Sequence, residues 1–270
     1  MASLNAIAAD KLLRLVGTPA APLVIDVRAN PHTLLPGSVP RGAEEVEDWA
    51  AALRAKPVVV ACDLGREFSA GIAAKLRSEG VAAEILEGGF EAWRASGAPT
   101  IDSAILPARD DRGRTMWVTR ARPKVDRIAC PWLIRRFVDP EAVILYVAPA
   151  DVAGVAERFG AAPFDIDGAK WSDRDGLCTF DALVRDLGLT GFPALLRLAE
   201  IVRGADTGRP DLTPQSGGLL AASLGLSRMH SDDLEQLEDG MILYDALYRW
   251  CRDAIDETHD ASVHSSKRKD

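Results

Sequence analysis

With 270 residues, the chain exceeds the usual size of a single domain, and its hydrophobic fraction of 47% is enough for two cores. A formal net charge of −8 and a pI near 5.1 argue against a general nucleic-acid binder, which would present a basic face to phosphates. No apolar run approaches the ~20 residues needed to span a bilayer and no signal peptide is visible, so the sequence predicts a soluble, cytoplasmic protein without a membrane partner.

The first 99 residues contain short apolar segments that are predicted to be buried strands. Residues 23–28 end in Asp26 and Arg28, residues 57–61 lead to Cys62, and residues 85–86 lead to a glycine pair and a helix. Cys62 is therefore expected at the end of a strand and before a helix N-terminus. Amide groups and the helix dipole at such a place can hold an oxyanion and lower the pKa of a thiol. The alternative is a buried structural cysteine.

Four features in this order resemble the rhodanese family across residues 20–99. They are the Asp26-x-Arg28 strand end, the Gly-x-x-Pro-x-Gly-Ala turn of residues 37–43, the loop headed by Cys62, and the Gly-Gly-x-x-x-Trp segment of residues 88–93. The resemblance implies a doubly wound parallel sheet in which Cys62 accepts sulfur as a persulfide from a donor such as thiosulfate and passes it to a thiol acceptor. Asp26 would support this site structurally, as Asp126 would in the second domain. The residues expected to bind the anion are Arg28, Asp63, Leu64, Gly65, Arg66, Glu67, Phe68, Arg127 and Arg135.

The loop after Cys62 departs from the family pattern. Glu67 and Phe68 stand where family loops carry Arg or Thr followed by Ser, while Arg66 comes one position early and Ser69 one position late. The phosphatase relatives of this fold need a His before the cysteine and an Arg six residues after it. Ala61 and Phe68 occupy those positions here, which argues against phosphatase activity.

A boundary is predicted after residue 99. Residues 100–114 have no sustained apolar period and are predicted to be a linker, residues 115–255 a second domain, and residues 256–270 a polar tail. The second domain is expected to be a mainly helical α+β unit. It has a strand-like run at residues 115–119, a strand at residues 142–147, core helix faces such as Leu195, Leu198 and Val202, and a short buried helix at residues 217–226.

Residues 120–136 form a local basic segment, with six Lys or Arg residues and one acid. The segment, which includes Arg127 and Arg135, could bind a small dianion or nucleic acid, or could pair with acids elsewhere in the fold.

The second domain resembles the chromate-resistance B domain of bacterial chromate operons over residues 115–252. The resemblance lies in residues 125–137, 163–165, 178–181, 201–206 and 243–248. It implies a role in resistance to chromate, a tetrahedral dianion that mimics sulfate.

The cysteines and acids of the second domain include residues that could bind a metal ion. The four cysteines lie far apart without a Cys-x-x-Cys pair, so free thiols are expected and no zinc knuckle is indicated. The sequence requires no cofactor. However, thiolate and carboxylate ligands in the second domain would suit iron or manganese. The residues of suitable type are Cys178, Asp181, Glu200 and Asp206, together with Asp245. The alternative is that these acids cap helices or pair with arginines such as Arg203.

Two classes of function follow from the sequence. The first is a thiol-dependent protein that transfers sulfur or handles oxyanions through Cys62, with thiosulfate, chromate or a thiol as small-molecule partners. The second is a chromate-responsive sensor or transcriptional regulator with a non-catalytic rhodanese-like scaffold. The acidic total charge and the lack of a helix-turn-helix pattern argue against DNA binding without excluding it. The sequence does not specify the oligomeric state.

Overall fold

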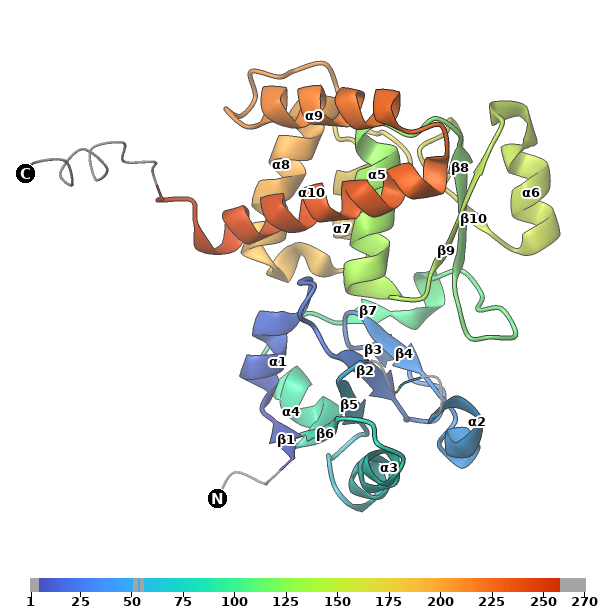
Figure 1. Cartoon of the computed structure of the whole chain (residues 1–270), viewed down its shortest axis with the longest axis vertical. Helices are drawn as coiled ribbons and strands as arrows, with labels where there is room; N and C mark the ends of the chain where they lie inside the picture. Colours follow the sequence, from blue (N-terminus) through green and yellow to red (C-terminus); the bar gives the residue numbers. More distant parts are fainter. Residues whose placement is uncertain (1–4, 51–52, 54–55, 258–270) are drawn as a thin grey trace, which may run out of the picture.

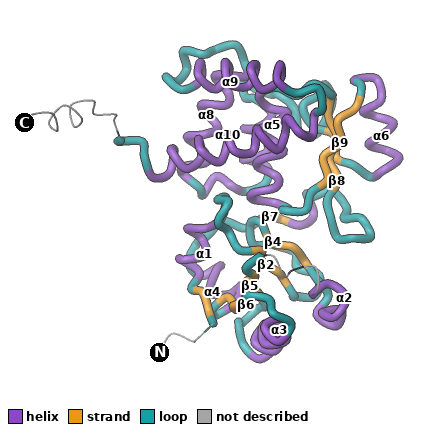
Figure 2. The backbone as a smooth tube through the Cα atoms, in the orientation of Figure 1, coloured by secondary structure: helices purple, strands orange, loops and turns teal. Residues whose placement is uncertain are grey.

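The computed structural model describes residues 5–50, 53 and 56–257, which form two parts stacked against each other (Figure 1). The N-terminal part is a five-stranded parallel sheet with helices. The C-terminal part is mainly helical and has a small parallel sheet at one side (Figure 2). Both match the predicted fold class. Within the described residues, no helix combines the length and apolar character that a bilayer crossing requires.

The sheet of the N-terminal part has the strand order β1-β6-β5-β2-β4. Its strands are β1 (Ala6–Ile7), β6 (Ala83–Leu86), β5 (Val58–Ala61), β2 (Leu23–Asp26) and β4 (Ser38–Pro40). All residues of β2 and β5 are buried, as expected for central parallel strands covered on both faces. β2 contains Val24 and Ile25 and β5 contains three consecutive valines, β-branched residues that pack well on a pleated surface.

Alternate residues of these strands pack on opposite faces of the sheet. Val24 and Val59 join a core with α1 (Ala9–Leu15) and α4 (Gly89–Ala95). Ile25 and Val60 join a second core with α2 (Val46–Ala50) and α3 (Glu67–Ser78). The side-chain period of two therefore places one helix layer on each face, which is the doubly wound arrangement.

The C-terminal part combines a three-stranded parallel sheet with a group of helices. The sheet has the order β10-β8-β9, and α6 (Val152–Phe159) packs beside it (Figure 1). Its strands are β8 (Met116–Arg120), β9 (Val143–Val147) and β10 (Ala162–Pro163). The helices on the other side are α5 (Val125–Leu133), α7 (Thr179–Asp186), α8 (Pro193–Asp206), α9 (Ser216–Met229) and α10 (Asp233–Asp253). A π-helical turn, Ile134–Val138, extends α5.

A proline inside α5 is accommodated by a side chain from β9. Pro131 has no N–H, so the carbonyl of Arg127 lacks its usual helical donor. The Tyr146 hydroxyl donates a hydrogen bond of 2.7 Å to that carbonyl. The helix can therefore continue through Pro131. The same hydrogen bond holds the first turn of α5, which carries Asp126, against the small sheet.

The two parts share one hydrophobic core. The cluster around α1 and α4 continues without a break into residues of the C-terminal part, including Trp117, Trp132 and Phe137. The Phe137 ring lies so close to Gly17 that a Cβ atom there would collide with it, and Gly37 N–H donates to the Phe137 carbonyl at 2.6 Å. The two parts therefore pack as one body.

Two sequence expectations need adjustment. The predicted linker contains β7 (Ile101–Asp102), which pairs antiparallel with β3 (Thr33–Leu34), because Ile101 is a buried core residue. The apolar segment at residues 217–226 is helical, as predicted, but it is not fully buried. It lies within α9, where Leu219 is buried while Leu224 is exposed. Leu195, Leu198 and Val202 are core residues of α8 as expected. Most of the predicted tail lies outside the described residues.

Candidate active site

Cys62 lies directly after β5, on the loop that leads into α3. Its side chain is 8% exposed. The loop carries amide groups at the N-terminal end of a twelve-residue helix, where backbone N–H groups have no intrahelical partner. This is the position that the sequence predicted for the thiol.

Backbone and side-chain donors surround the sulfur. Gly65 N–H donates to Cys62 Sγ at 3.2 Å, and Sγ lies 3.2 Å from Ser69 Oγ, the hydroxyl of a fully buried residue on α3. Burial raises the pKa of the Cys62 thiol. The hydrogen bond between the thiol and the Ser69 hydroxyl, which itself donates to the Arg66 carbonyl at 3.1 Å, and hydrogen bonds from the backbone of Arg66, Ser69 and Leu64 together outweigh that effect and hold the pKa below its ordinary value. The arrangement stabilises a thiolate.

Two glycines allow the Cys62 loop to pack closely against the start of α4. Gly65 and Gly89 both have φ of +61°, and their backbones touch. A Cβ atom at Gly89 would lie 2.5 Å from Gly65 N and 2.6 Å from Asp63 O, so only glycine fits there. Phe90 N–H and Glu91 N–H donate to the carbonyls of Cys62 and Asp63. The start of α4 thus fixes the loop that holds the thiol.

Asp26 and Arg28 form a buried ion pair at the end of β2. Arg28 donates to both carboxylate oxygens of Asp26, at 2.9 and 2.6 Å, and to the carbonyl of Thr33 at 2.7 Å. Its guanidinium also lies 3.7 Å from the centre of the Phe90 ring. Arg28 therefore ties β2 to the start of α4. To bind an anion as predicted, Arg28 would have to use N–H groups other than those that already donate to Asp26 and Thr33.

The rim of the loop is exposed and carries both charges. Asp63, Arg66 and Glu67 are exposed, and the apolar side chains of Leu64 and Phe68 are each 52% exposed. Phe68 also lines a cavity of about 440 Å³ that includes Arg28 and Arg41 but not Cys62. Arg66, at the N-cap of α3, is exposed and forms no ion pair among the described residues.

Cys62 differs from the other three cysteines, all of which are free thiols. Cys130 and Cys178 are fully enclosed, and burial raises the pKa of each far above its ordinary value. Burial raises the pKa of Cys251 to about 11. Of the four thiols, only Cys62 lies in surroundings that favour the thiolate.

The arginines of the basic segment are largely engaged within the C-terminal part. Arg127 pairs with Asp165 at 3.1 Å, and Arg135 pairs with Glu238 at 2.6 Å. Arg136 forms two hydrogen bonds with Asp245. Pairing with acids, one of the alternatives considered from the sequence, accounts for these residues.

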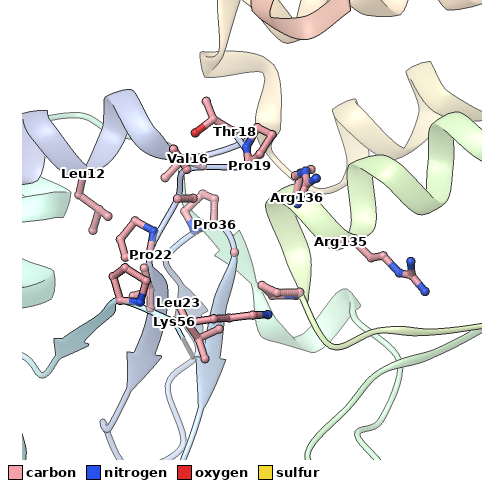
Figure 3. A pocket seen from close by; sticks show the side chains of 16 residues that line it. Leu12, Val16, Thr18, Pro19, Pro22, Leu23, Pro36, Lys56, Arg135 and Arg136 are labelled. Atoms are coloured by element: carbon pink, nitrogen blue, oxygen red, sulfur yellow. The ribbon is translucent and has the colours of Figure 1, made fainter. Parts of the chain in front are cut away.

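Arg135 and Arg136 also border a cavity of about 380 Å³ between the two parts (Figure 3). Leu23 and Pro57, at the starts of β2 and β5, line the same cavity. Cys62 lies at the other end of these strands, so the thiol loop and the inter-domain cavity are separate.

The four expected metal ligands do not come together as one group among the described residues. Asp181 accepts hydrogen bonds from the Cys178 amide and thiol at the start of α7 and pairs with Arg203. Glu200 is exposed on α8. Asp206, the last residue of α8, instead lies with Asp126 and Asp173, each offering one carboxylate oxygen within 4.8 Å of the others.

Sequence reasoning missed Ser69 as the partner of the thiol and Asp173 as a member of this acidic group. Ser69 was visible as the first serine after the cysteine, one position late. Asp173 gave no signal, because it lies in a polar loop that meets Asp126 and Asp206 only in the folded chain.

Comparison with known proteins identifies relatives for both parts. Residues 117–251 match the family model described as ChrB, C-terminal domain, and residues 8–96 match that of the rhodanese-like domain. Protein ChrB of Cupriavidus metallidurans is 33% identical over 160 residues, which cover 56% of this chain and 46% of that protein. The chain thus spans about half the length of this curated relative.

Two solved structures are similar to the N-terminal part. A rhodanese-related protein from Thermoplasma volcanium is 25% identical and covers 36% of this chain and 98% of its own, with a TM-score of 0.33. A rhodanese-like domain protein from Staphylococcus aureus is 21% identical and covers 33% of this chain and 91% of its own, with a TM-score of 0.31.

Proposed function

Because the chain belongs to the family of the ChrB C-terminal domain and carries a rhodanese-like domain ahead of it, we propose that it is a chromate-resistance protein that carries sulfur on Cys62. The observation that carries this proposal is the set of hydrogen-bonding groups around the sulfur. Gly65 N–H and the Ser69 hydroxyl lie at 3.2 Å, and the thiol pKa is lowered despite burial. A thiolate is the nucleophile that sulfur transfer requires.

The transfer step needs no metal and no external oxidant. The Cys62 thiolate attacks the outer sulfur of thiosulfate, a new S–S bond forms to Cys62, and the S–S bond of the donor breaks. The bonding pair leaves with sulfite, and Cys62 becomes a persulfide. An acceptor thiolate then attacks the terminal sulfur of the persulfide and restores the Cys62 thiolate.

The loop supplies most of the anion-binding groups. Its amides and the N-terminus of α3 present partial positive charge, and exposed Arg66 adds a full positive charge. Exposed Glu67 partly offsets this charge. The same donors suit chromate, which shares the tetrahedral shape and double negative charge of the sulfur oxyanions. Cys62 thus joins sulfur chemistry to an oxyanion site.

The acceptor reaches Cys62 from outside this chain. The loop follows the last residue of β5, whereas Pro57, just before the first residue of β5, lines the inter-domain cavity. The described hydrogen bonds of Cys62 all come from the N-terminal part, so a small thiol or another protein would serve as the acceptor.

Intact-protein mass spectrometry after incubation with thiosulfate tests the proposal. The unmodified chain should gain about one sulfur mass, and a reductant should remove it. Cys62→Ser should gain nothing. Cys251→Ser is the matched control, because it removes a buried thiol of raised pKa, and it should load like the unmodified chain. A gain that persists in Cys62→Ser, or no gain on a free Cys62 thiol, would rule out sulfur transfer through this residue.

A second candidate function is a chromate-responsive regulator whose rhodanese-like part is only a scaffold. One observation favours it: Glu67 places a negative charge at the first position of α3, beside a site that should attract anions. In a chromate-sensitive host, Cys62→Ser should lower the tolerance that this chain confers if sulfur transfer is the function. Unchanged tolerance would favour the regulator.

A further inference from the structure

Three carboxylates from separate elements converge in the C-terminal part. Asp126 is the second residue of α5, Asp206 ends α8, and Asp173 lies in the loop before α7. Their oxygens lie within 4.8 Å of one another. Asp126 is 1% exposed, whereas Asp173 is at the surface, so the group runs from the interior to the solvent.

A buried oxygen without a partner lies in this group. Asp126 Oδ2 accepts a hydrogen bond from Phe180 N–H at 3.1 Å, but Asp126 Oδ1 is buried and has no hydrogen-bond partner among the described residues. A buried carboxylate oxygen left unpaired is costly, so its retention needs an explanation. A bound cation would provide one.

The other two carboxylates are each held by a single donor. Asp206 Oδ1 accepts from Asp126 N–H at 3.3 Å, and Asp173 Oδ1 accepts from the Thr179 hydroxyl at 2.9 Å. That hydroxyl also lies 3.3 Å from Asp165 Oδ1. These hydrogen bonds orient the carboxylates of Asp206 and Asp173 and use only one oxygen of each. Hydrogen bonds to groups behind the ligands orient metal-binding carboxylates in the same way.

The group carries negative charge that its neighbours offset only in part, through the attraction between Arg127 and Asp206. The nearby carboxylate of Asp165 pairs with Arg120 and Arg127, each at 3.1 Å. Within the described part of the chain, Asp126, Asp173 and Asp206 form no ion pair. Three carboxylates held this close together repel one another, and a doubly charged cation would offset most of that repulsion.

From this geometry we infer that Asp126, Asp173 and Asp206 form a binding site for a divalent cation that prefers oxygen ligands, such as Mg²⁺ or Mn²⁺. Carboxylates suit these ions, whereas thiolates suit softer ones. Asp173 borders two cavities, of about 200 and 360 Å³, which provide a route from solvent. The site shares only Asp206 with the ligands expected from the sequence, and it is independent of the chemistry of Cys62.

Binding of Mn²⁺ to the full chain, stripped of metal with a chelator, tests the inference. Electron paramagnetic resonance of free Mn²⁺ should report one ion bound per chain, displaced by excess Mg²⁺. Asp173→Asn and Asp206→Asn should each weaken binding roughly tenfold or more. Asp173 is exposed, so its substitution should leave the thermal unfolding temperature without metal nearly unchanged.

Asp175→Asn is the matched control. Asp175 is also exposed, lies two residues away in the same loop and is not a member of the group. It should bind Mn²⁺ like the unmodified chain. Equal losses in the Asp173 and Asp175 variants would indicate only diffuse attraction to an acidic surface. No Mn²⁺ binding at millimolar concentration would also overturn the inference, and a proton shared by Asp126 and Asp206 would then account for the unpaired oxygen.

Discussion

Burial raises the pKa of the Cys62 thiol, and the hydrogen bond with the Ser69 hydroxyl is the first of the contacts that lower it, so we expect Ser69 to influence the reactivity of Cys62. Ser69→Ala should raise that pKa, so a smaller fraction of the thiol is ionised at pH 7. Each unit of increase costs close to tenfold in thiolate while the pH stays well below the pKa. Alkylation of Cys62 by iodoacetamide, followed across pH 6–10, should therefore slow at neutral pH and reach its midpoint at higher pH.

Ser78→Ala is the control for this measurement. Ser78 lies on the same helix, and its hydroxyl donates only to the carbonyl of Lys75 at 2.7 Å. The pH profile of Cys62 should not move in this variant. A profile that is equally unmoved in Ser69→Ala would mean that the backbone amides alone set the thiol pKa.

Single residues were predictable from the sequence where their role depends on near neighbours. Cys62 could be placed because its strand, loop and helix are contiguous in the chain. Asp126 could be named but not paired with Asp173, because the two meet through a contact between α5 and a loop 47 positions later. The sequence likewise could not show that Nε and Nη2 of Arg28 already donate to Asp26 and Thr33, since the contact with Thr33 depends on how the chain folds.

At the scale of elements, the junction between the Cys62 loop and α4 depends on Gly89. In Gly89→Ala, the new Cβ atom should collide with Gly65 N and Asp63 O. The alanine would also have to adopt a φ of +61°, a left-handed conformation that is strained for any residue with a Cβ atom. The expected loss is about 1–3 kcal/mol of unfolding free energy, together with reduced sulfur loading of Cys62. Urea unfolding and the thiosulfate mass assay would measure the two effects.

Gly71→Ala serves as the comparison on a neighbouring element. Gly71 lies on α3 with open space around its Cβ position, so alanine should stabilise the helix by roughly 0.5–1 kcal/mol. Full stability and full loading in Gly89→Ala would show that the loop can shift away from α4 without loss.

Elements were predictable to the extent that local pattern decides them. The uninterrupted apolar residues of β2 and β5 indicated buried parallel strands, and the structure confirms them. The exposed side of α9 was not foreseen, because its alanine and leucine residues give no sign of which face meets α8. β7 was missed because two residues form a strand only where β3 lies beside them.

At the scale of the whole molecule, the shared core predicts that both parts unfold together. Phe137→Ala removes a fully buried ring that packs on Trp132, Phe192 and Tyr248 and touches Gly17 of the other part. The loss should be about 3–5 kcal/mol. Hydrogen exchange should show β2 and β5 losing protection at the same denaturant concentration as α5 and α8.

Phe159→Ala provides the control, because Phe159 is 49% exposed on α6. It should change stability by no more than about 0.5 kcal/mol. If Phe137→Ala instead shifted only the C-terminal helices and left the protection of β2 and β5 intact, the two parts would be independent folding units.

The packing of Phe137 against Gly17 also affects whether the rhodanese-like part can be separated from the C-terminal part. Leu12, Val16 and Leu35 of the rhodanese-like part are buried in the core that continues into the C-terminal helices. A protein cut at residue 99 would expose this apolar face to water, and apolar patches of that kind promote aggregation. The rhodanese-like part is thus no longer an interchangeable module, and any exchange of it for a free-standing relative would have to rebuild that face.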